Sequence, residues 1–173
     1  MAVSTAAKAA EKTPTKAARN FLGLYFPYHY EVGFAVEREM RDPRLTQLQN
    51  VILWTLHSAG DEQHALPRKQ IEAILRPWFE VTSSAFSKAL RSLMAPPLEF
   101  LTLSEHPHSG REKLVTLGPA GVAAVNAMAS RGERYIQRIV NELSAKEIAE
   151  GTRFMTRVSA ITKSFDDESF RRG

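Results

Sequence analysis

The sequence predicts a mainly α-helical chain that also contains one small β-hairpin. From about residue 20 onward, apolar residues recur every three or four positions, which is typical of amphipathic helices. One region, between about Leu98 and Leu117, instead contains two short strand-like runs around a loop of turn residues. Proline or glycine stands where these segments end, so the order of elements is helices, then a hairpin, then helices.

Length and composition indicate a single compact domain. The chain has 173 residues, a net charge of +4 and 43% hydrophobic residues, so it can bury a core. It has no cysteine, which excludes disulfides, thiolate metal sites and cysteine nucleophiles. No apolar run is long enough to span a bilayer and no secretory signal is present, so a cytoplasmic location is expected. We expect a flexible basic tail over 1–19, the domain over 20–166 and a C-terminal tail over 167–173.

The first helix is expected from about Pro27 to Arg41, with Pro27 in its first turn, where a missing N–H costs nothing. The stretch around it is rich in aromatic residues, including Tyr28, Tyr30 and Phe34. So many rings on a short helix need to be buried. A core or a subunit interface would bury them, and a pocket for an aromatic ligand is the alternative.

Three further helices are expected at about 45–57, 67–75 and 81–94, the last capped by Thr82 or Ser83. At 100° per residue, this last helix has one narrow apolar face, made of Phe86, Ala89, Leu90 and Leu93. Its opposite face carries short hydroxyls and two long cations, namely Ser84, Ser87, Lys88 and Arg91.

The hairpin is expected to pair residues 98–104 with 113–117, around a loop that carries Arg111. Gly118 and Pro119 then open a long helix, with a kink expected near Gly132. A capping box formed by Ser144 and Glu147 begins the last helix. The apolar stripes of segments 21–41 and 119–166 exceed what the hairpin and its helices can cover. A second copy of the chain is the simplest partner, so both segments are predicted to dimerise.

Three helices followed by a hairpin make a winged helix-turn-helix, here at about 45–118. The polar face of the 81–94 helix suits the major groove of DNA, where small donors and cations reach phosphates and base edges. An ordinary solvated helix surface is the alternative. The residues predicted to contact DNA are Ser83, Ser84, Ser87, Lys88, Arg91, Arg111 and Lys113. The basic tail could add an arm along the DNA, although a solvated tail is the preferred interpretation.

Three segments, 45–49, 81–94 and 110–121, resemble the MarR (multiple antibiotic resistance regulator) family of transcription factors. The last is the most specific, because Arg111 stands at the family's wing arginine and Lys113 at the basic strand position. Two residues depart from the pattern: Ser109 replaces the wing aspartate, and Gly118 replaces the capping threonine. The resemblance implies a homodimer with two winged modules on adjacent major grooves of a pseudo-palindromic operator. It also implies repression, and release from DNA by a small aromatic or phenolic ligand.

The ligand would occupy a pocket where the first helix meets the 45–57 helix, near Tyr28, Tyr30, Phe34, Trp54 and His57. Packing of the same rings in the dimer interface is the alternative. A metal site at His106 and His108 is considered but disfavoured against solvent exposure or contact with the DNA backbone. No catalytic motif is present, so neither an enzyme nor a bound cofactor is expected. A winged-helix module that binds only proteins is the other functional class, but it would not need the cations at positions 88, 91, 111 and 113.

Overall fold

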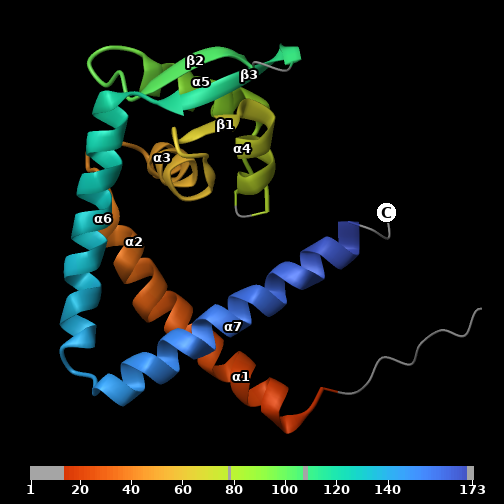
Figure 1. The fold of residues 1–173 in the computed structure, drawn as a ribbon, viewed down its shortest axis with the longest axis vertical. Coiled ribbons are helices and arrows are strands. Elements are labelled where there is room, and N and C mark those ends of the chain that lie inside the picture. Colours follow the sequence, from red (N-terminus) through yellow and green to blue (C-terminus); the bar gives the residue numbers. More distant parts are fainter. Residues whose placement is uncertain (1–13, 78, 107–108, 171–173) are drawn as a thin grey trace, which may run out of the picture. The chain divides into compact units, whose positions relative to one another are not determined.

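The computed structural model describes residues 14–77, 79–106 and 109–170, with the side chains of 106, 110, 111 and 166–170 excepted. The chain forms two compact units, one ending at Arg38 and the other beginning at Glu39. The elements, labelled in Figure 1, are α1 (Lys16–Pro27), the π-helix η1 (Tyr28–Gly33), α2 (Phe34–Met40), α3 (Gln47–Ala59), β1 (Ala65–Pro67), α4 (Arg68–Leu75), α5 (Ser83–Met94), β2 (Leu101–His106), β3 (Ser109–Leu117), α6 (Pro119–Val140) and α7 (Ala145–Phe170).

The first helix begins at Lys16, about eleven residues before the position expected from the sequence. The hydroxyl of Thr15 caps it by accepting a hydrogen bond from the N–H of Ala18, at 3.2 Å. Pro27 therefore lies inside a continuous helical run, not in a first turn, and the π-helix η1 follows it directly. Residues 16–20, at the start of this helix, carry little apolar periodicity, so the pattern did not reveal it.

The second unit is built around α3, whose Ile52, Leu53 and Leu56 are completely buried. Thr46 begins this helix with a capping box, in which its hydroxyl accepts from the N–H of Gln49 and its own N–H donates to Gln49 Oε1 at 2.8 Å. The sequence placed this start at about residue 45. Helices α4 and α5 and the sheet pack around α3 (Figure 1) and complete one hydrophobic core.

The sheet has three antiparallel strands in the order β1-β3-β2, whereas the sequence predicted only the β2–β3 hairpin. In the added strand, Ala65 pairs with Thr116 and Leu66 pairs with Val115. A strand of three residues is too short to show periodicity, and it forms only because β3 offers it an edge to pair with. The mainly α-helical fold with a small β-sheet is otherwise as predicted.

The connection from β3 to α6 depends on a glycine. A Cβ built on Gly121 would lie 2.1 Å from the carbonyl oxygen of Phe100, so only glycine fits there. The N–H of Gly118 donates to the same oxygen at 2.9 Å. These contacts hold the first turn of α6 against the chain that enters β2.

Helix α6 runs past Gly132 without interruption, from Pro119 to Val140. Gly132 is buried against the side chain of Met40 instead, where a Cβ would lie 2.8 Å from Met40 Cγ. The glycine thus provides space for the side chain at the end of α2 and is not a break in the helix.

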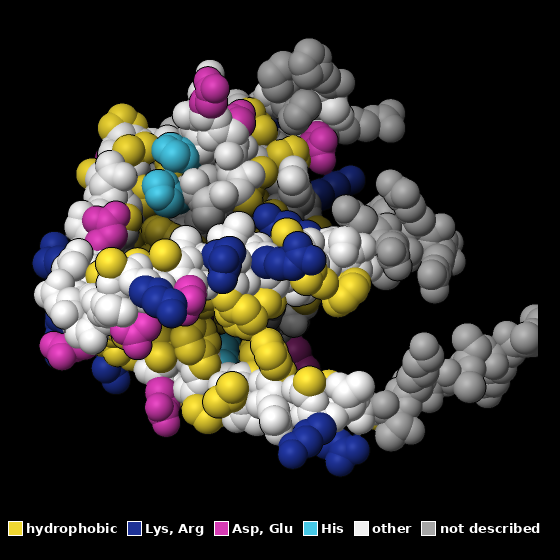
Figure 2. All heavy atoms as spheres, turned by 60° about the horizontal axis from the view of Figure 1, so that its bottom comes forward, with side chains coloured by type: hydrophobic (Ala, Val, Ile, Leu, Met, Phe, Trp, Pro, Cys, Tyr) yellow, Lys and Arg dark blue, Asp and Glu magenta, His cyan; other side chains and the backbone are white. Residues whose placement is uncertain are grey.

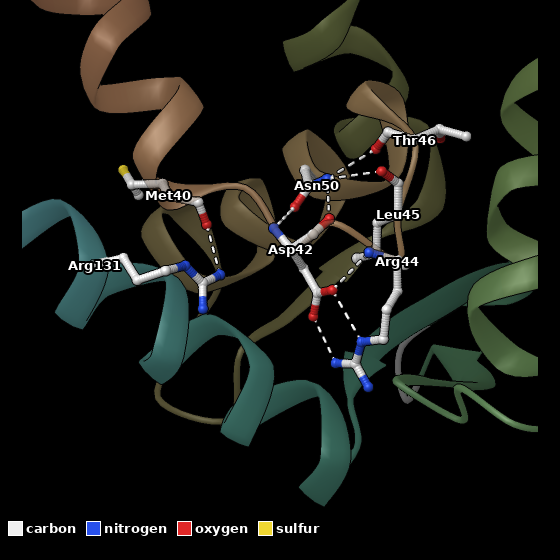
Figure 3. Close-up of polar contacts among 7 residues, drawn as sticks. All are labelled: Met40, Asp42, Arg44, Leu45, Thr46, Asn50 and Arg131. Carbon is white, nitrogen blue, oxygen red and sulfur yellow. Dashed lines mark hydrogen bonds and ion pairs between the residues drawn. The ribbon is translucent and has the colours of Figure 1, made fainter.

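A polar network holds the segment between α2 and α3 in place (Figure 3). Arg131 of α6 caps the end of α2 by donating to the carbonyl oxygens of Glu39, at 3.2 Å, and Met40, at 2.8 Å. The N–H of Asp42 donates to Asn50 Oδ1 at 2.8 Å, and Asn50 Nδ2 donates back to the Asp42 carbonyl. The start of α3 is therefore fixed to the middle of α6.

Asp42 is buried and pairs with Arg44, whose Nε lies 2.9 Å from Asp42 Oδ1. The hydrogen bonds and the charge of Arg44 hold the pKa of Asp42 below its usual value, against the opposing effect of burial. The guanidinium of Arg44 also lies over the ring of Phe100, 5.3 Å from its centroid. One residue thereby links the start of α3 to the chain entering the wing.

The capping box of α7 is confirmed: the N–H of Glu147 donates to Ser144 Oγ, and the N–H of Ser144 donates to Glu147 Oε2 at 2.8 Å. The Ser144 hydroxyl, by donating to the same oxygen, lowers the pKa of the Glu147 carboxyl. Within the described part of the chain, no helix is long and apolar enough to cross a membrane.

Candidate nucleic-acid interface

Helix α5 has the two faces that its sequence predicts. Thr82 caps it by accepting from the N–H of Ala85 at 3.2 Å. The four apolar side chains assigned to its inner face are buried, namely Phe86, Ala89, Leu90 and Leu93. On the other side, Ser84, Lys88 and Arg91 are exposed, and Ser87 is partly buried. The helix therefore presents small hydroxyls and two cations to solvent from a rigid, well-packed base.

Two of the predicted DNA-contacting hydroxyls are already engaged within the protein. Ser87 Oγ lies 2.7 Å from the carbonyl oxygen of Ser83 and 2.7 Å from Arg68 Nη2. A carbonyl can only accept and a guanidinium can only donate, so the Ser87 hydroxyl donates to the first and accepts from the second. Ser83 Oγ lies 2.7 Å from Glu72 Oε1 and donates its proton to that carboxylate. Neither hydroxyl is free to donate to a base.

Arg68, which the sequence pattern did not single out, is brought to the predicted interface by the fold. It is the first residue of α4, and its side chain crosses to the second turn of α5. Its guanidinium lies 5.8 Å from the ring centroid of the buried Phe86. The contact joins residues nineteen positions apart, so only a tertiary model of the two helices could have indicated it.

Glu72 adds a carboxylate beside the same surface, which the sequence also did not indicate. Besides the hydrogen bond from Ser83, it lies 4.0 Å from Arg76 Nη2, one helical turn further along the chain. Its side chain is mostly covered, whereas that of Arg76 is exposed. The carboxylate fixes the direction of the Ser83 hydroxyl and lowers the positive charge at the start of α5.

The wing carries one described cation of the predicted set. Lys113 in β3 stands directly opposite Glu105 in β2, and Lys113 Nζ lies 3.1 Å from Glu105 Oε1. Both side chains are exposed, so the pair is weak and can be replaced by a pair with phosphate. Arg111 belongs to β3, but its side chain lies outside the described residues, as do His108 and the side chain of His106.

The residues of the predicted ligand pocket fall in both units. In the first unit, Tyr30 and Phe34 meet edge to face with centroids 5.1 Å apart, and Tyr28 is half exposed. In the second, the rings of Trp54 and His57 lie 5.1 Å apart. The aromatic clusters exist within each unit, and a pocket that joins them stays a prediction.

A cavity of about 630 Å³ lies at the end of α6. It is lined by Tyr135, Arg138, Ile139, Asn141, Glu142 and Leu143. None of the residues predicted to bind a ligand belongs to this lining. Across the described residues, no group of three or more His, Cys, Asp or Glu side chains could hold a metal ion.

No model of a known protein family matches the chain, and no curated protein matches it in sequence. Solved structures do match it. Rv1404 from Mycobacterium tuberculosis is 20% identical, over 87% of this chain and 97% of that one, with a TM-score of 0.66. Sco3205 from Streptomyces coelicolor, a MarR family transcriptional regulator in complex with DNA, is 15% identical over 87% and 91%, with a TM-score of 0.59.

A third match is BpsR from Bordetella bronchiseptica, whose DNA binding is regulated by 6-hydroxynicotinic acid. It is 22% identical, over 80% of this chain and 98% of that one, with a TM-score of 0.54. At such identities a structural match establishes the fold alone. This chain has the winged helix-turn-helix fold of MarR family transcriptional regulators, with helices before and after the winged part.

Proposed function

On the basis of this fold, we propose that the protein is a sequence-specific DNA-binding transcriptional regulator that represses from an inverted-repeat operator. The observation that carries the proposal is the outer face of α5, where solvent-accessible Ser84, Lys88 and Arg91 stand on a helix whose other face is buried. In a helix-turn-helix, the second helix enters the major groove. An arginine or a lysine there pairs with guanine, and each good bidentate pair gives about 1–3 kcal/mol of discrimination.

The proposal includes a homodimer. Large apolar side chains of α1 and α7 are exposed, including Phe21, Leu24, Phe154 and Phe165, at 49–70%. Hydrophobic side chains are visible at the surface in the view of Figure 2. Exposed apolar area on this scale marks an interaction surface. Because a symmetric dimer presents two copies of α5, the DNA that it reads is a pseudo-palindrome.

The proposal also includes control by a ligand. It rests on the aromatic rings near Tyr28, Tyr30, Phe34, Trp54 and His57 and on BpsR, which responds to 6-hydroxynicotinic acid. A titration of Trp54 fluorescence with phenolic and aromatic acids, read together with release of DNA, tests it. If a broad panel gives neither quenching nor release, the rings only pack against other parts of the protein.

DNA binding itself is tested by a gel shift on the gene's own upstream region, with Arg91→Ala as the variant. We expect loss of about 5- to 150-fold in affinity, which corresponds to one lost base contact. Lys69→Ala, which removes an exposed cation of α4 instead, is the matched control. An unchanged affinity in Arg91→Ala, with folding and dimer intact, would show that α5 does not read this DNA.

A module that binds only proteins is the competing function. It would have no use for the solvent-accessible cations Lys88, Arg91 and Lys113. The matching regulators are not enzymes, and no catalytic role is proposed. A cytoplasmic location, where the DNA of such regulators is found, belongs to the same proposal.

A further inference from the structure

The outer face of α5 includes one group that comes from another helix, the guanidinium of Arg68. Its Nη2 lies 2.7 Å from Ser87 Oγ, and Ser87 stands in the middle of the face that carries Ser84, Lys88 and Arg91. Arg68 is therefore part of the surface that would meet the DNA, although it belongs to α4.

The guanidinium is held in one orientation from two sides. Ser87 fixes one edge of it, and the ring of Phe86 lies beneath it, 5.8 Å from Cζ. Ser87 is itself fixed, because its hydroxyl proton goes to the carbonyl oxygen of Ser83 at 2.7 Å. An arginine held in this way loses little side-chain entropy when it binds a planar acceptor pair, since its fork is already oriented.

Most of the hydrogen-bonding capacity of Arg68 remains available. A guanidinium has about five N–H donors, and the bond to Ser87 uses one of them. Within the described residues, no carboxylate forms an ion pair with Arg68. Ser87, by contrast, has no donor left, because its only hydroxyl proton is already donated to the carbonyl oxygen of Ser83.

From these contacts we infer that Arg68 is a specificity-determining residue that reads a guanine edge in the major groove, and that Ser87 is its positioning residue. The inference rests on the proposed DNA binding and refines it. Guanine presents two acceptors, O6 and N7, that match the arginine fork. A phosphate oxygen is the other available acceptor. Ser87 lies on the same side of α5 as Lys88 and Arg91, which is the side proposed to enter the groove, so it would direct the fork toward the bases.

The structural alternative is that the Arg68–Ser87 bond only ties α4 to α5. Such a tie would affect stability and would lower affinity for every DNA sequence alike. Base reading instead changes the preference at one base pair in each half-site. Sequence preference is therefore the measurement that separates the two roles.

The probe is a duplex selected by the unmodified protein from a randomised oligonucleotide library, together with its single-base-pair variants and a random duplex. We expect Arg68→Ala to bind the selected duplex about 5- to 150-fold more weakly and to lose discrimination at one guanine per half-site. Arg68→Lys keeps the charge but not the fork, so it should lose the same discrimination while its affinity for random DNA stays unchanged. Lys69→Ala, which removes the neighbouring exposed cation of α4, is the matched control and should keep the discrimination.

The role of Ser87 is tested by a double-mutant cycle. Ser87→Ala should weaken binding to the selected duplex in the unmodified protein and have no further effect in Arg68→Ala, because its effect passes through the arginine. Additive losses would mean that Ser87 contacts the DNA by itself, and they would overturn the positioning role.

Equal losses on selected and random DNA, or no loss in Arg68→Ala, would overturn the guanine contact. Thermal unfolding of each variant controls for damage to the fold, and Arg68→Lys keeps the test valid if Arg68→Ala unfolds. Failure of the unmodified protein to select any duplex would contradict the proposed function itself. A duplex that depends on Arg91 but not on Arg68 would overturn only the role of Arg68.

Discussion

Helices α3 and α7 both have amphipathic sequences, but the apolar side chains of α3 are buried and those of α7 are exposed. In α3, Ile52, Leu53 and Leu56 are completely buried by α4, α5 and the sheet. In α7, Phe154 is 49% exposed and Ile161 is 42% exposed. An apolar stripe shows that a helix has a surface to cover, but it does not show whether the cover comes from the same chain. The winged part is covered by its own chain, and we propose that α7 is covered by a second copy.

The largest expected effects compare one side chain from each helix. Leu53→Ala should lower the free energy of unfolding by about 3–5 kcal/mol, because it leaves a cavity in a closed core. Ile161→Ala should instead raise the dissociation constant of the dimer and have a smaller effect on the folding of the winged part. Urea unfolding and sedimentation equilibrium measure the two effects. An unchanged dissociation constant in Ile161→Ala would break the comparison.

Two helical glycines, one packed against a neighbouring backbone and one in open space, allow the same comparison of a covered and an uncovered helix. Gly121→Ala should destabilise the protein by about 3 kcal/mol, because the new Cβ would collide with the Phe100 carbonyl. Nothing in the described part of the chain lies within 4 Å of a Cβ at Gly151 of α7, so Gly151→Ala should stabilise its helix by about 0.5–1 kcal/mol. Urea unfolding followed by circular dichroism is the measurement. Tolerance of alanine at 121 would contradict the packing, whereas destabilisation at 151 would reveal a second backbone against α7.

The third comparison depends on pH and is between two carboxylates. The pKa of Asp42 is lowered mainly by its hydrogen bonds from Arg44. The ionised carboxylate therefore stabilises the fold fully above the pKa of an unfolded aspartate, about 4, and this stabilisation is lost as the pH falls through the lower pKa of the folded state. Asp42→Asn should therefore cost about 1–3 kcal/mol at pH 7, and the difference should shrink below about pH 4. Glu147→Gln, at an exposed helix start with a pKa lowered in the same direction, is the control and should change stability less. A difference that is constant with pH would contradict the role of the Asp42 charge.

Periodicity and caps predicted the winged part well, because most of its helices have their own start signals. Thr46 and Thr82 cap two of these helices, and outside the winged part the Ser144–Glu147 pair caps α7. The sequence indicated the cap of α7 and gave Thr82 as one of two candidates for the cap of α5. The features that the sequence did not predict either depend on contacts made by the folded chain or lie in segments without apolar periodicity. The strand β1 exists only by pairing with β3, and the early start of α1 lies in alanine-rich sequence that carries little apolar pattern.

The same distinction holds for the candidate site. Helical spacing alone predicted which residues of α5 are buried and which are accessible. It could not predict that the hydroxyls of Ser83 and Ser87 donate hydrogen bonds to Glu72 and to a backbone carbonyl. Nor could it predict that Arg68 donates a hydrogen bond to Ser87. The contacts of Glu72 and Arg68 come from a neighbouring helix, whose position relative to α5 is set by the core and not by either segment.

The central claim is that a second copy of the chain covers the helices outside the winged part, and that the resulting dimer places two α5 helices on DNA. The most direct test is footprinting on an operator recovered from the upstream region of the gene. We expect two protected half-sites in inverted repeat, about 10 bp apart centre to centre, because the two helices must enter successive major grooves on one face of the duplex. Ile161→Ala should weaken both protections together, since it separates the subunits. Protection of a single half-site by the unmodified protein would contradict the pairing of two α5 helices by a dimer.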